Sequence, residues 1–346
     1  MKIALFLFFA LVASLLASPD DDWNVIVAMD AGPPVKPTSA AEARVLGKSH
    51  FVKHQALIED FLKKNPNDPR AFDARLRLAA ILSATGKMEK KQSLVDEAMR
   101  MLQALEKDKS FPLDKRADAG FRRVSLYMQS LDSPENESRR DIVTAARNFQ
   151  SRYPNDRRTP RLLVEVATVC DNAPDLKREL LNAALASSPD ESLKRRIGDD
   201  LKRLALLGKP LALRLNTIQG RSIDTSNLSG RIVFLIFWAA DSAPSLLWMQ
   251  NFQLALANLP VDRFSIITIS LDKDPALPME RLKDMGMSQW ATSCDGKSWD
   301  GAIARQCGIN SLPTVLLLDQ SGVVRAINVR GSYESWIRKL LMQPAS

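Results

Sequence analysis

Between about residue 46 and residue 207, apolar side chains recur every three or four positions, which is the spacing of one face of an α-helix. Three such series cover residues 51–62, 72–82 and 94–105. Breakers such as the Asn-Pro-Asn-Asp-Pro run at 65–69 and Gly86 separate them. The pattern predicts an all-α domain of amphipathic helices over 46–207.

This helical region repeats one of its turns. Residues 61–70 and 149–158 share a leading Phe and a Pro-Asn-Asp turn, and Pro189-Asp190 is a looser copy. An aromatic residue near a helix end, a proline turn and an Asp that can cap the next helix are typical of stacked helical hairpins. The turns resemble those of TPR-like repeats, but the full repeat signature is missing. A non-repetitive helical bundle stays open.

From about residue 208 the pattern becomes alternating and β-branched, so we expect a second domain over 208–346. Two continuous apolar runs, 232–237 and 264–271, predict strands that are covered on both faces. Helical spacing at 246–259 and 278–285 alternates with them, and a hairpin and a last helix follow, at 312–329 and 333–341. This order predicts an α/β domain with one central mixed sheet flanked by helices.

The second domain resembles the thioredoxin fold, and within it the TlpA/ResA-like branch of exported thiol-disulfide oxidoreductases. The resemblance covers about residues 208–343. It rests on Phe237-Trp238-Ala239, on the Gly-Ile-Asn-Ser-Leu-Pro-Thr run at 308–314, and on the Leu-Asp-Gln-Ser-Gly turn at 318–322.

The redox motif of that family is absent. The family carries Cys-x-x-Cys at a helix N-terminus two residues after Phe-Trp-Ala, and this chain has Ser242 and Ser245 there. Trp248 and Gln250 replace the family's Glu and Pro that follow. Thiol-disulfide exchange requires a thiolate, so we expect no catalytic residue and no cofactor at this site. Ser242 is instead expected to cap the helix.

The resemblance implies that a recognition surface survives. Leu312-Pro313 matches the family's cis proline, which presents the preceding backbone to an extended peptide, and Trp238 is expected to lie close to it. Trp238, Leu312, Pro313 and Thr314 are therefore the predicted peptide-binding residues.

Three cysteines remain, an odd number that matches no metal motif. Cys170 and Cys307 are expected to be buried, whereas Cys294 could be exposed. Cys294 and Cys307 are the candidates for an altered redox site, and a disulfide between them stays open.

Charge and histidine content exclude other functions. Lys and Arg number 48 against 40 Asp and Glu, but the signs are mixed, so we expect no nucleic-acid partner. The only histidines, His50 and His54, have no acidic companion in their motif, so we expect a helix surface and no metal. The second domain holds no histidine for a hydrolytic triad, which leaves only a Ser-Lys pair with Lys273 formally open.

The N-terminus predicts export. Residues 3–17 form an apolar run behind Met1-Lys2, too short for an ordinary membrane span, and we interpret 1–18 as a signal peptide. An uncleaved anchor is the less favoured alternative, and no lipid anchor is indicated. Residues 19–45 are predicted to be a linker. The mature chain is expected in the periplasm or another extracytoplasmic space.

Two functions follow. The favoured one is a polypeptide-binding or scaffold protein with partners in the cell envelope, whose thioredoxin-like domain has lost its dithiol. The alternative is an active oxidoreductase that uses Cys294 or Cys307. Fold resemblance alone does not decide between them.

Overall fold

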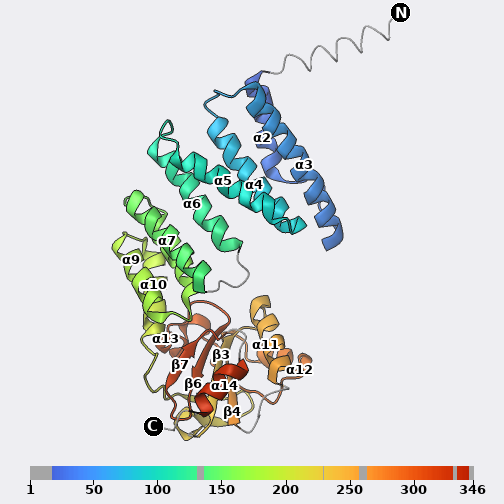
Figure 1. Ribbon diagram of the computed structural model, residues 1–346. Helices are drawn as coiled ribbons and strands as arrows, with labels where there is room; N and C mark the ends of the chain where they lie inside the picture. Colours follow the sequence, from blue (N-terminus) through green and yellow to red (C-terminus); the bar gives the residue numbers. More distant parts are fainter. Residues whose placement is uncertain (1–17, 131–135, 229, 257–262, 330–332, 343–346) are drawn as a thin grey trace, which may run out of the picture. The chain divides into compact units, whose positions relative to one another are not determined.

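The computed structural model describes residues 18–130, 136–228, 230–256, 263–329 and 333–342 (Figure 1). The chain forms two compact units, one ending at Arg158 and the other beginning at Thr159. The predicted signal peptide lies outside the described residues, apart from Ser18. Within the described ranges, no helix combines the length and apolar character needed to cross a membrane.

The first unit is entirely helical, as the periodicity predicts. Its helices are α2 (Pro19–Ala28), α3 (Ala40–Lys64), α4 (Ala71–Glu89), α5 (Gln92–Lys107), α6 (Leu113–Gln129) and α7 (Asn136–Arg152), with the short η1 (Met29–Ala31) after α2. Ile58, Phe61 and Phe72 lie in a shared core and are almost fully buried.

The predicted linker contains a packed helix, and the prediction is wrong for that part. Ser18 accepts a hydrogen bond from the Asp21 backbone, and the Asp21 carboxylate accepts one from the Ser18 backbone, which forms a capping box at the start of α2. Ile26 is completely buried, and the Trp23 ring lies 5.5 Å from that of Phe61. Asp20, Asp21 and Asp22, whose polarity is typical of a linker, lie in the first turn of α2, where negative charge is favourable.

His54 also departs from the expected helix surface. Only 5% of the residue is exposed, and Nε2 lies 3.9 Å from Oδ1 of Asp30. Burial lowers the pKa of His54 below its ordinary value. His50 does reach a polar partner, since its Nε2 lies 2.9 Å from the Met29 carbonyl oxygen.

The two copies of the repeated turn form the same hydrogen bonds. Asp68 accepts from the backbone and the guanidinium of Arg70, at 2.7–2.8 Å. Asp156 accepts from the same groups of Arg158, at 2.7–2.9 Å. Each Asp therefore holds the Arg two residues later, and after the first copy no side chain caps α4. At the looser copy of the turn, Asp190 does cap the following helix, because it accepts from Leu193 N at 2.8 Å.

The second unit begins with three helices and continues into an α/β domain. The helices are α8 (Thr159–Ala167), α9 (Pro174–Ala186) and α10 (Glu191–Leu204), with η2 (Thr168–Cys170) between the first two. The sheet has the strands β3 (Ile232–Trp238), β4 (Phe264–Ser270), β5 (Ala291–Cys294), β6 (Thr314–Leu318) and β7 (Val324–Ile327). The remaining elements are β1 (Arg214–Asn216), β2 (Ser222–Asp224), η3 (Thr225–Leu228), α11 (Ala243–Leu256), α12 (Ala276–Asp284), η5 (Ser298–Asp300), α13 (Ala302–Gln306) and α14 (Tyr333–Leu341).

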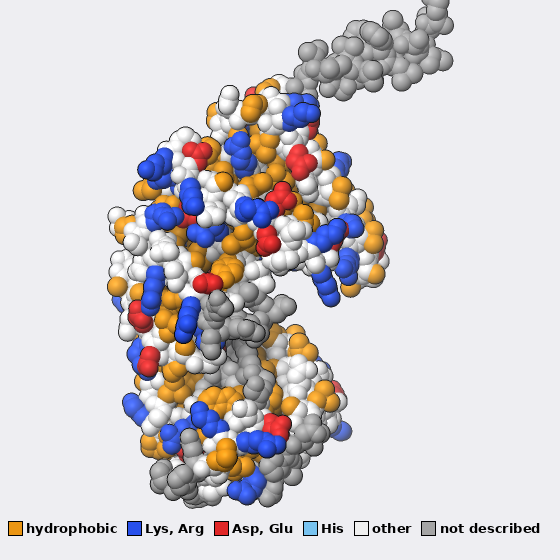
Figure 2. Space-filling view, viewed as in Figure 1, with side chains coloured by type: hydrophobic (Ala, Val, Ile, Leu, Met, Phe, Trp, Pro, Cys, Tyr) orange, Lys and Arg blue, Asp and Glu red, His pale blue; other side chains and the backbone are white. Residues whose placement is uncertain are grey.

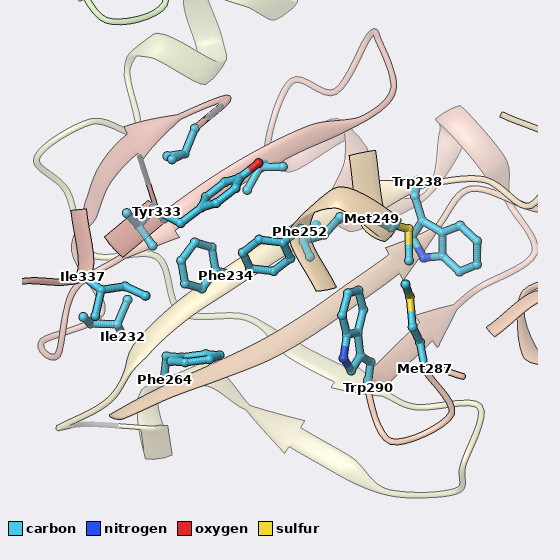
Figure 3. Packing of buried hydrophobic residues seen from close by; sticks show 14 of the residues in the cluster. Ile232, Phe234, Trp238, Met249, Phe252, Phe264, Met287, Trp290, Tyr333 and Ile337 are labelled. Atoms are coloured by element: carbon cyan, nitrogen blue, oxygen red, sulfur yellow. The ribbon is translucent and has the colours of Figure 1, made fainter. Parts of the chain in front are cut away.

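The sheet has the order β5-β4-β3-β6-β7. β3, β4 and β5 run parallel, whereas β6 is antiparallel to β3 and to β7. The central strand β3 is buried at every position. One of its faces packs on α11 and α14 through a cluster of aromatic rings, in which Phe252 lies 4.9 Å from both Phe234 and Tyr333 (Figure 3). This topology is a thioredoxin-like fold, as the sequence predicts.

The division between the units falls at 158/159 and not near residue 208, because α10 is bonded to the α/β domain. Arg203 on α10 is 3% exposed and donates to the Gly308 carbonyl and to Asp200. Asn310 donates to the Arg196 carbonyl and to Asp200, both at 3.0 Å. We therefore treat α8–α10 as part of the second unit.

The surface charges are mixed. On the face shown in Figure 2, Lys and Arg side chains alternate with Asp and Glu and with apolar side chains. Many are paired, for example Lys48 with Glu89 at 2.7 Å and Lys64 with Asp60 at 2.6 Å. Such exposed pairs contribute little stability, commonly about 0–1 kcal/mol each.

Candidate functional site

Ser242 and Ser245, the serines that the resemblance aligns with a redox dithiol, lie in the serine segment, residues 239–245, which joins β3 to α11 and includes the first turn of α11. Ser242 N donates to the Ala239 carbonyl at 3.1 Å, and the Ser242 carbonyl accepts from Leu246 N at 3.0 Å. The Ser242 hydroxyl also accepts from Ser245 N, at 3.4 Å. The predicted cap at the start of α11 is therefore present.

The two hydroxyl groups contact each other directly. Ser245 Oγ donates to Ser242 Oγ at 2.8 Å. Ser242 is half-buried, whereas Ser245 is fully buried. The pair thus has one accessible and one inaccessible hydroxyl group, and a hydrogen bond joins them.

This serine pair has no evident means of activation. Both histidines of the chain lie in the first unit, and Lys273 forms no hydrogen bond to Ser242 in the described structure. A serine hydroxyl is a weak nucleophile without an adjacent base. The geometry therefore gives no support to hydrolytic chemistry at Ser242.

The positions that follow the serines are structural. The Trp248 ring is stacked on that of Phe252, with centroids 4.9 Å apart and planes 27° apart. Trp248 thus extends the core of the domain. Gln250 is exposed and supplies no ionisable group.

A buried carboxylate that sequence reasoning missed, that of Asp272, is hydrogen-bonded to the backbone of the serine segment. Asp272 follows β4, is 8% exposed and accepts from Ala240 N at 3.0 and 3.2 Å. It also accepts from Ser270 Oγ at 2.6 Å. The sequence did carry a signal for this residue, since Asp272 directly follows the apolar run at 264–271. The carboxyl ends of parallel strands lie at the same edge of a sheet, so Asp272 could be expected near the end of β3.

The predicted recognition loop lies before β6. The Leu312-Pro313 peptide bond is cis, as expected, and both residues are half-exposed. Within the described part of the chain, no hydrogen bond uses the backbone N–H or C=O of Leu312. Ser311, one residue earlier, has its carbonyl occupied by the Thr314 hydroxyl at 2.8 Å.

Two of the four predicted contact residues do not reach the surface. Trp238 and Thr314 are both fully buried. Trp238 lies in the core beside Met249 and Met287, and its Nε1 has no hydrogen-bond partner among the described residues (Figure 3). A peptide at this edge would therefore meet Leu312 and Pro313, with Trp238 and Thr314 acting as support.

None of the three cysteines forms a disulfide, so the bond between Cys294 and Cys307 that the sequence left open is not formed. Cys307 is completely buried, and burial raises the pKa of its thiol to about 12. Cys170 is also buried and donates to the Val166 carbonyl at 3.5 Å. A thiol that keeps its proton at neutral pH is a poor nucleophile, which removes Cys307 as a redox candidate.

Cys294 is the accessible thiol. It is half-buried, ends β5 and donates to the Asp272 carbonyl at 3.2 Å. The strand register places Cys294 opposite Ser270, which in turn lies opposite Trp238. Cys294 therefore lies two strands, or about 10 Å, from Trp238, and the serine segment begins directly after Trp238 at the same end of the strands.

The described residues contain no cluster of three or more His, Cys, Asp or Glu side chains that could hold a metal ion. The expectation that no metal or cofactor is required stays a prediction.

Comparison with known proteins gives matches for the second unit only among solved structures. No protein-family model matches the chain, and no curated protein does. A thiol-disulfide oxidoreductase from Bacteroides fragilis is 23% identical, and the match covers 38% of this chain and 98% of that one, with a TM-score of 0.33. The thioredoxin domain of a thiol-disulfide oxidoreductase from Bacteroides vulgatus is 18% identical over 39% and 97%, with a TM-score of 0.35.

A thioredoxin-like protein, also from Bacteroides vulgatus, is 20% identical over 38% of this chain and 86% of its own, with a TM-score of 0.34. At such identities and scores, the chemistry of the site has to be argued from the residues of this chain.

Proposed function

We propose that this chain is an exported polypeptide-binding protein whose thioredoxin-like domain carries no redox activity. The observation that carries the proposal is the hydroxyl pair at the start of α11, where Ser242 and Ser245 are 2.8 Å apart. Neither oxygen can form a mixed disulfide, since exchange passes through a sulfur–sulfur bond. The partners would be polypeptides of the cell envelope.

The free backbone groups of Leu312 support the binding half of the proposal. An extended polypeptide can pair with unpaired N–H and C=O groups in the manner of an added strand. Leu312 is half-exposed and uses neither group within the described residues. Pro313 and the buried Thr314 hold this backbone in place from the following residues.

Binding at Leu312 can be tested with fluorescently labelled, reduced and alkylated insulin B chain, a flexible polypeptide without free thiols. Leu312→Asp places a charge beside the proposed contact and is expected to weaken binding at least fivefold in fluorescence anisotropy. Leu254→Asp is the matched control, because Leu254 is 74% exposed on α11 and lies outside the proposed edge. Equal binding by the two variants would refute binding at Leu312.

The second candidate function is thiol-disulfide exchange through Cys294. Its support is that Cys294 is half-buried at the same sheet edge as the serine segment. Its thiolate would attack a substrate disulfide, form a mixed disulfide and release one substrate thiolate. A second thiol, from a partner or a small dithiol, would have to resolve that bond, because no other accessible cysteine lies in the sequence.

Turnover separates the two functions. The full chain is assayed for reduction of insulin disulfides with dithiothreitol as the electron source, beside its Cys294→Ser variant. The proposed function predicts no rate above that of dithiothreitol alone for either protein. A rate that the intact chain shows and Cys294→Ser loses would establish the oxidoreductase instead.

A further inference from the structure

A groove runs between two helices of the first unit. One face of α4 and one face of α6 line a cavity of about 330 Å³. Leu102 on α5 forms part of its floor, and α5 packs against both α4 and α6. The groove is thus built from three consecutive helices of one unit.

Small residues on α4 create the hollow. Ala79, Ala80, Ser83 and Ala84 line it at successive turns of the helix. An apolar cavity of roughly 150 Å³ takes one benzene ring, so about 330 Å³ is enough for one or two large apolar side chains. Leu76, Leu102 and Leu126 give this space an apolar lining.

The charged residues at the groove are both cations. Lys87 and Arg122 line it, and no acidic residue does. Arg122 is already paired with Asp118 at 2.9 Å. Lys87 has no carboxylate partner among the described residues. Its Nζ donates instead to the side-chain oxygen of Gln129, at 3.0 Å.

The surroundings of Lys87 favour an anion from outside. Partial burial lowers the pKa of Lys87, and no acidic side chain that the structure describes offsets this effect. Ser125, a further lining residue, has a buried hydroxyl without a hydrogen-bond partner in the described structure. An incoming carboxylate at Lys87 would supply the missing counter-charge.

We infer that the groove between α4 and α6 is a polypeptide-binding site that takes an apolar side chain into the cavity and a carboxylate onto Lys87. The occupant is therefore an acidic segment in which apolar and acidic residues lie close together. This site is separate from the edge at Leu312, and the inference goes beyond the proposed function.

The test uses the full chain and a fluorescein-labelled octapeptide of alternating Leu and Glu, followed by anisotropy at low ionic strength. Lys87→Glu reverses the one charge lining the groove that has no ion-pair partner among the described residues, and it is expected to weaken binding about tenfold or more. Ala80→Leu fills the cavity from an exposed helical position and is expected to weaken it at least fivefold. Lys53→Glu, the same charge reversal on the exposed surface of α3, is expected to stay within twofold.

Matched peptides resolve the two parts of the site. Lys87→Gln, a milder second variant, should bind the Leu-Glu peptide more weakly than the intact chain does. A peptide in which every Glu is replaced by Gln should bind both proteins equally. Replacing every Leu by Ser should abolish the effect of Ala80→Leu. Unchanged helical circular dichroism and unfolding midpoints ensure that the variants are folded.

Binding that neither Lys87→Glu nor Ala80→Leu weakens would overturn the inference. If Leu312→Asp alone weakens binding, the peptide occupies the edge of the thioredoxin-like domain, so the inference fails and the proposed function stands. If the groove variants weaken binding and Leu312→Asp does not, the inference stands regardless of the proposed function.

Discussion

Gly308 lies close against the backbone of α10, just before the Leu312 loop. Its φ of +63° lies in the left-handed region, and a Cβ there would be 2.4 Å from the Asp199 carbonyl oxygen and 3.2 Å from Arg203 N. Both neighbours are backbone atoms of α10, which cannot move aside as a flexible side chain can. Gly308→Ala therefore requires α10 to shift away from the loop.

The expected loss of stability has two parts. The left-handed conformation costs a non-glycine residue about 1–2 kcal/mol. Forcing an extra carbon into a packed contact adds about 1–3 kcal/mol. Gly308→Ala should therefore destabilise the second unit by about 2–5 kcal/mol.

A matched glycine separates these two parts. Gly322 has a φ of +75°, but its Cβ would meet no atom within 4 Å. Gly322→Ala should therefore show only the conformational cost, about 1–2 kcal/mol. The difference between the two variants then measures the contact with α10 alone.

Urea unfolding followed by tryptophan fluorescence provides the assay, since five of the six tryptophans lie beyond residue 158. Far-ultraviolet circular dichroism follows both units, so a transition of the first unit can be recognised separately. If Gly308→Ala and Gly322→Ala lower the free energy of unfolding equally, α10 is not held against this loop, and the reasoning on the second unit fails.

Three further predictions concern the thiols, the repeated turn and the serine pair. With Ellman's reagent at pH 8, one thiol of the native chain should react rapidly and Cys294→Ser should remove it, because Cys170 and Cys307 are buried; three rapid thiols would contradict this burial. Hydrogen bonds from Arg70 lower the pKa of Asp68 to about 2, against about 3.9 in an unfolded chain, so its stabilising effect is complete above pH 4 and is lost as the pH falls toward 2. The free energy of unfolding of Asp68→Asn should therefore fall less between pH 4 and pH 2 than that of the intact chain. If the two proteins lose stability in parallel over this range, the pair of Asp68 and Arg70 does not contribute to acid unfolding. Replacing Ser242 and Ser245 together by Cys should give an oxidisable dithiol, detectable by mass after alkylation, with one thiol pKa below the usual value of about 8.5 because it lies at the N-terminus of α11; two thiols that never pair would argue against the observed proximity.

The α/β domain was predictable because its signals are local. Continuous apolar runs identify β3 and β4, and the Pro-Thr pair at 313–314 marks the start of β6. The position of Ser242 and Ser245 at a helix start follows from the same short segment. Each of these features depends on neighbours within a few residues.

The burial of Trp238 was also accessible to sequence reasoning. Side chains of a strand alternate between its two faces, so Trp238 shares a face with Phe234 and Ile236. All three lie in one buried cluster. The resemblance predicted that Trp238 contacts a bound peptide, whereas the alternation places it in the core, and the alternation was the better guide.

The boundary at 158/159 was not predictable from local pattern. The sequence of α10 is rich in Lys, Arg and Asp, which is typical of a solvent-exposed helix surface. Its buried pair of Arg203 and Asp200 becomes recognisable only through Gly308 and Asn310, about a hundred residues later. The packing of α2 was equally unpredictable, because Trp23 contacts Phe61 and Arg77, which lie on other helices.

The proposed absence of redox activity and the proposed binding edge are compatible because they depend on different parts of the domain. The serine pair is held by the start of α11 and by Asp272, through Ala240. The Leu312 edge is held from the other side, by Asn310 against α10. Exchanging sulfur for oxygen at Ser242 leaves the hydrogen bonds at Asn310 untouched. We therefore expect a variant that places thiols at Ser242 and Ser245 to leave binding at Leu312 unchanged.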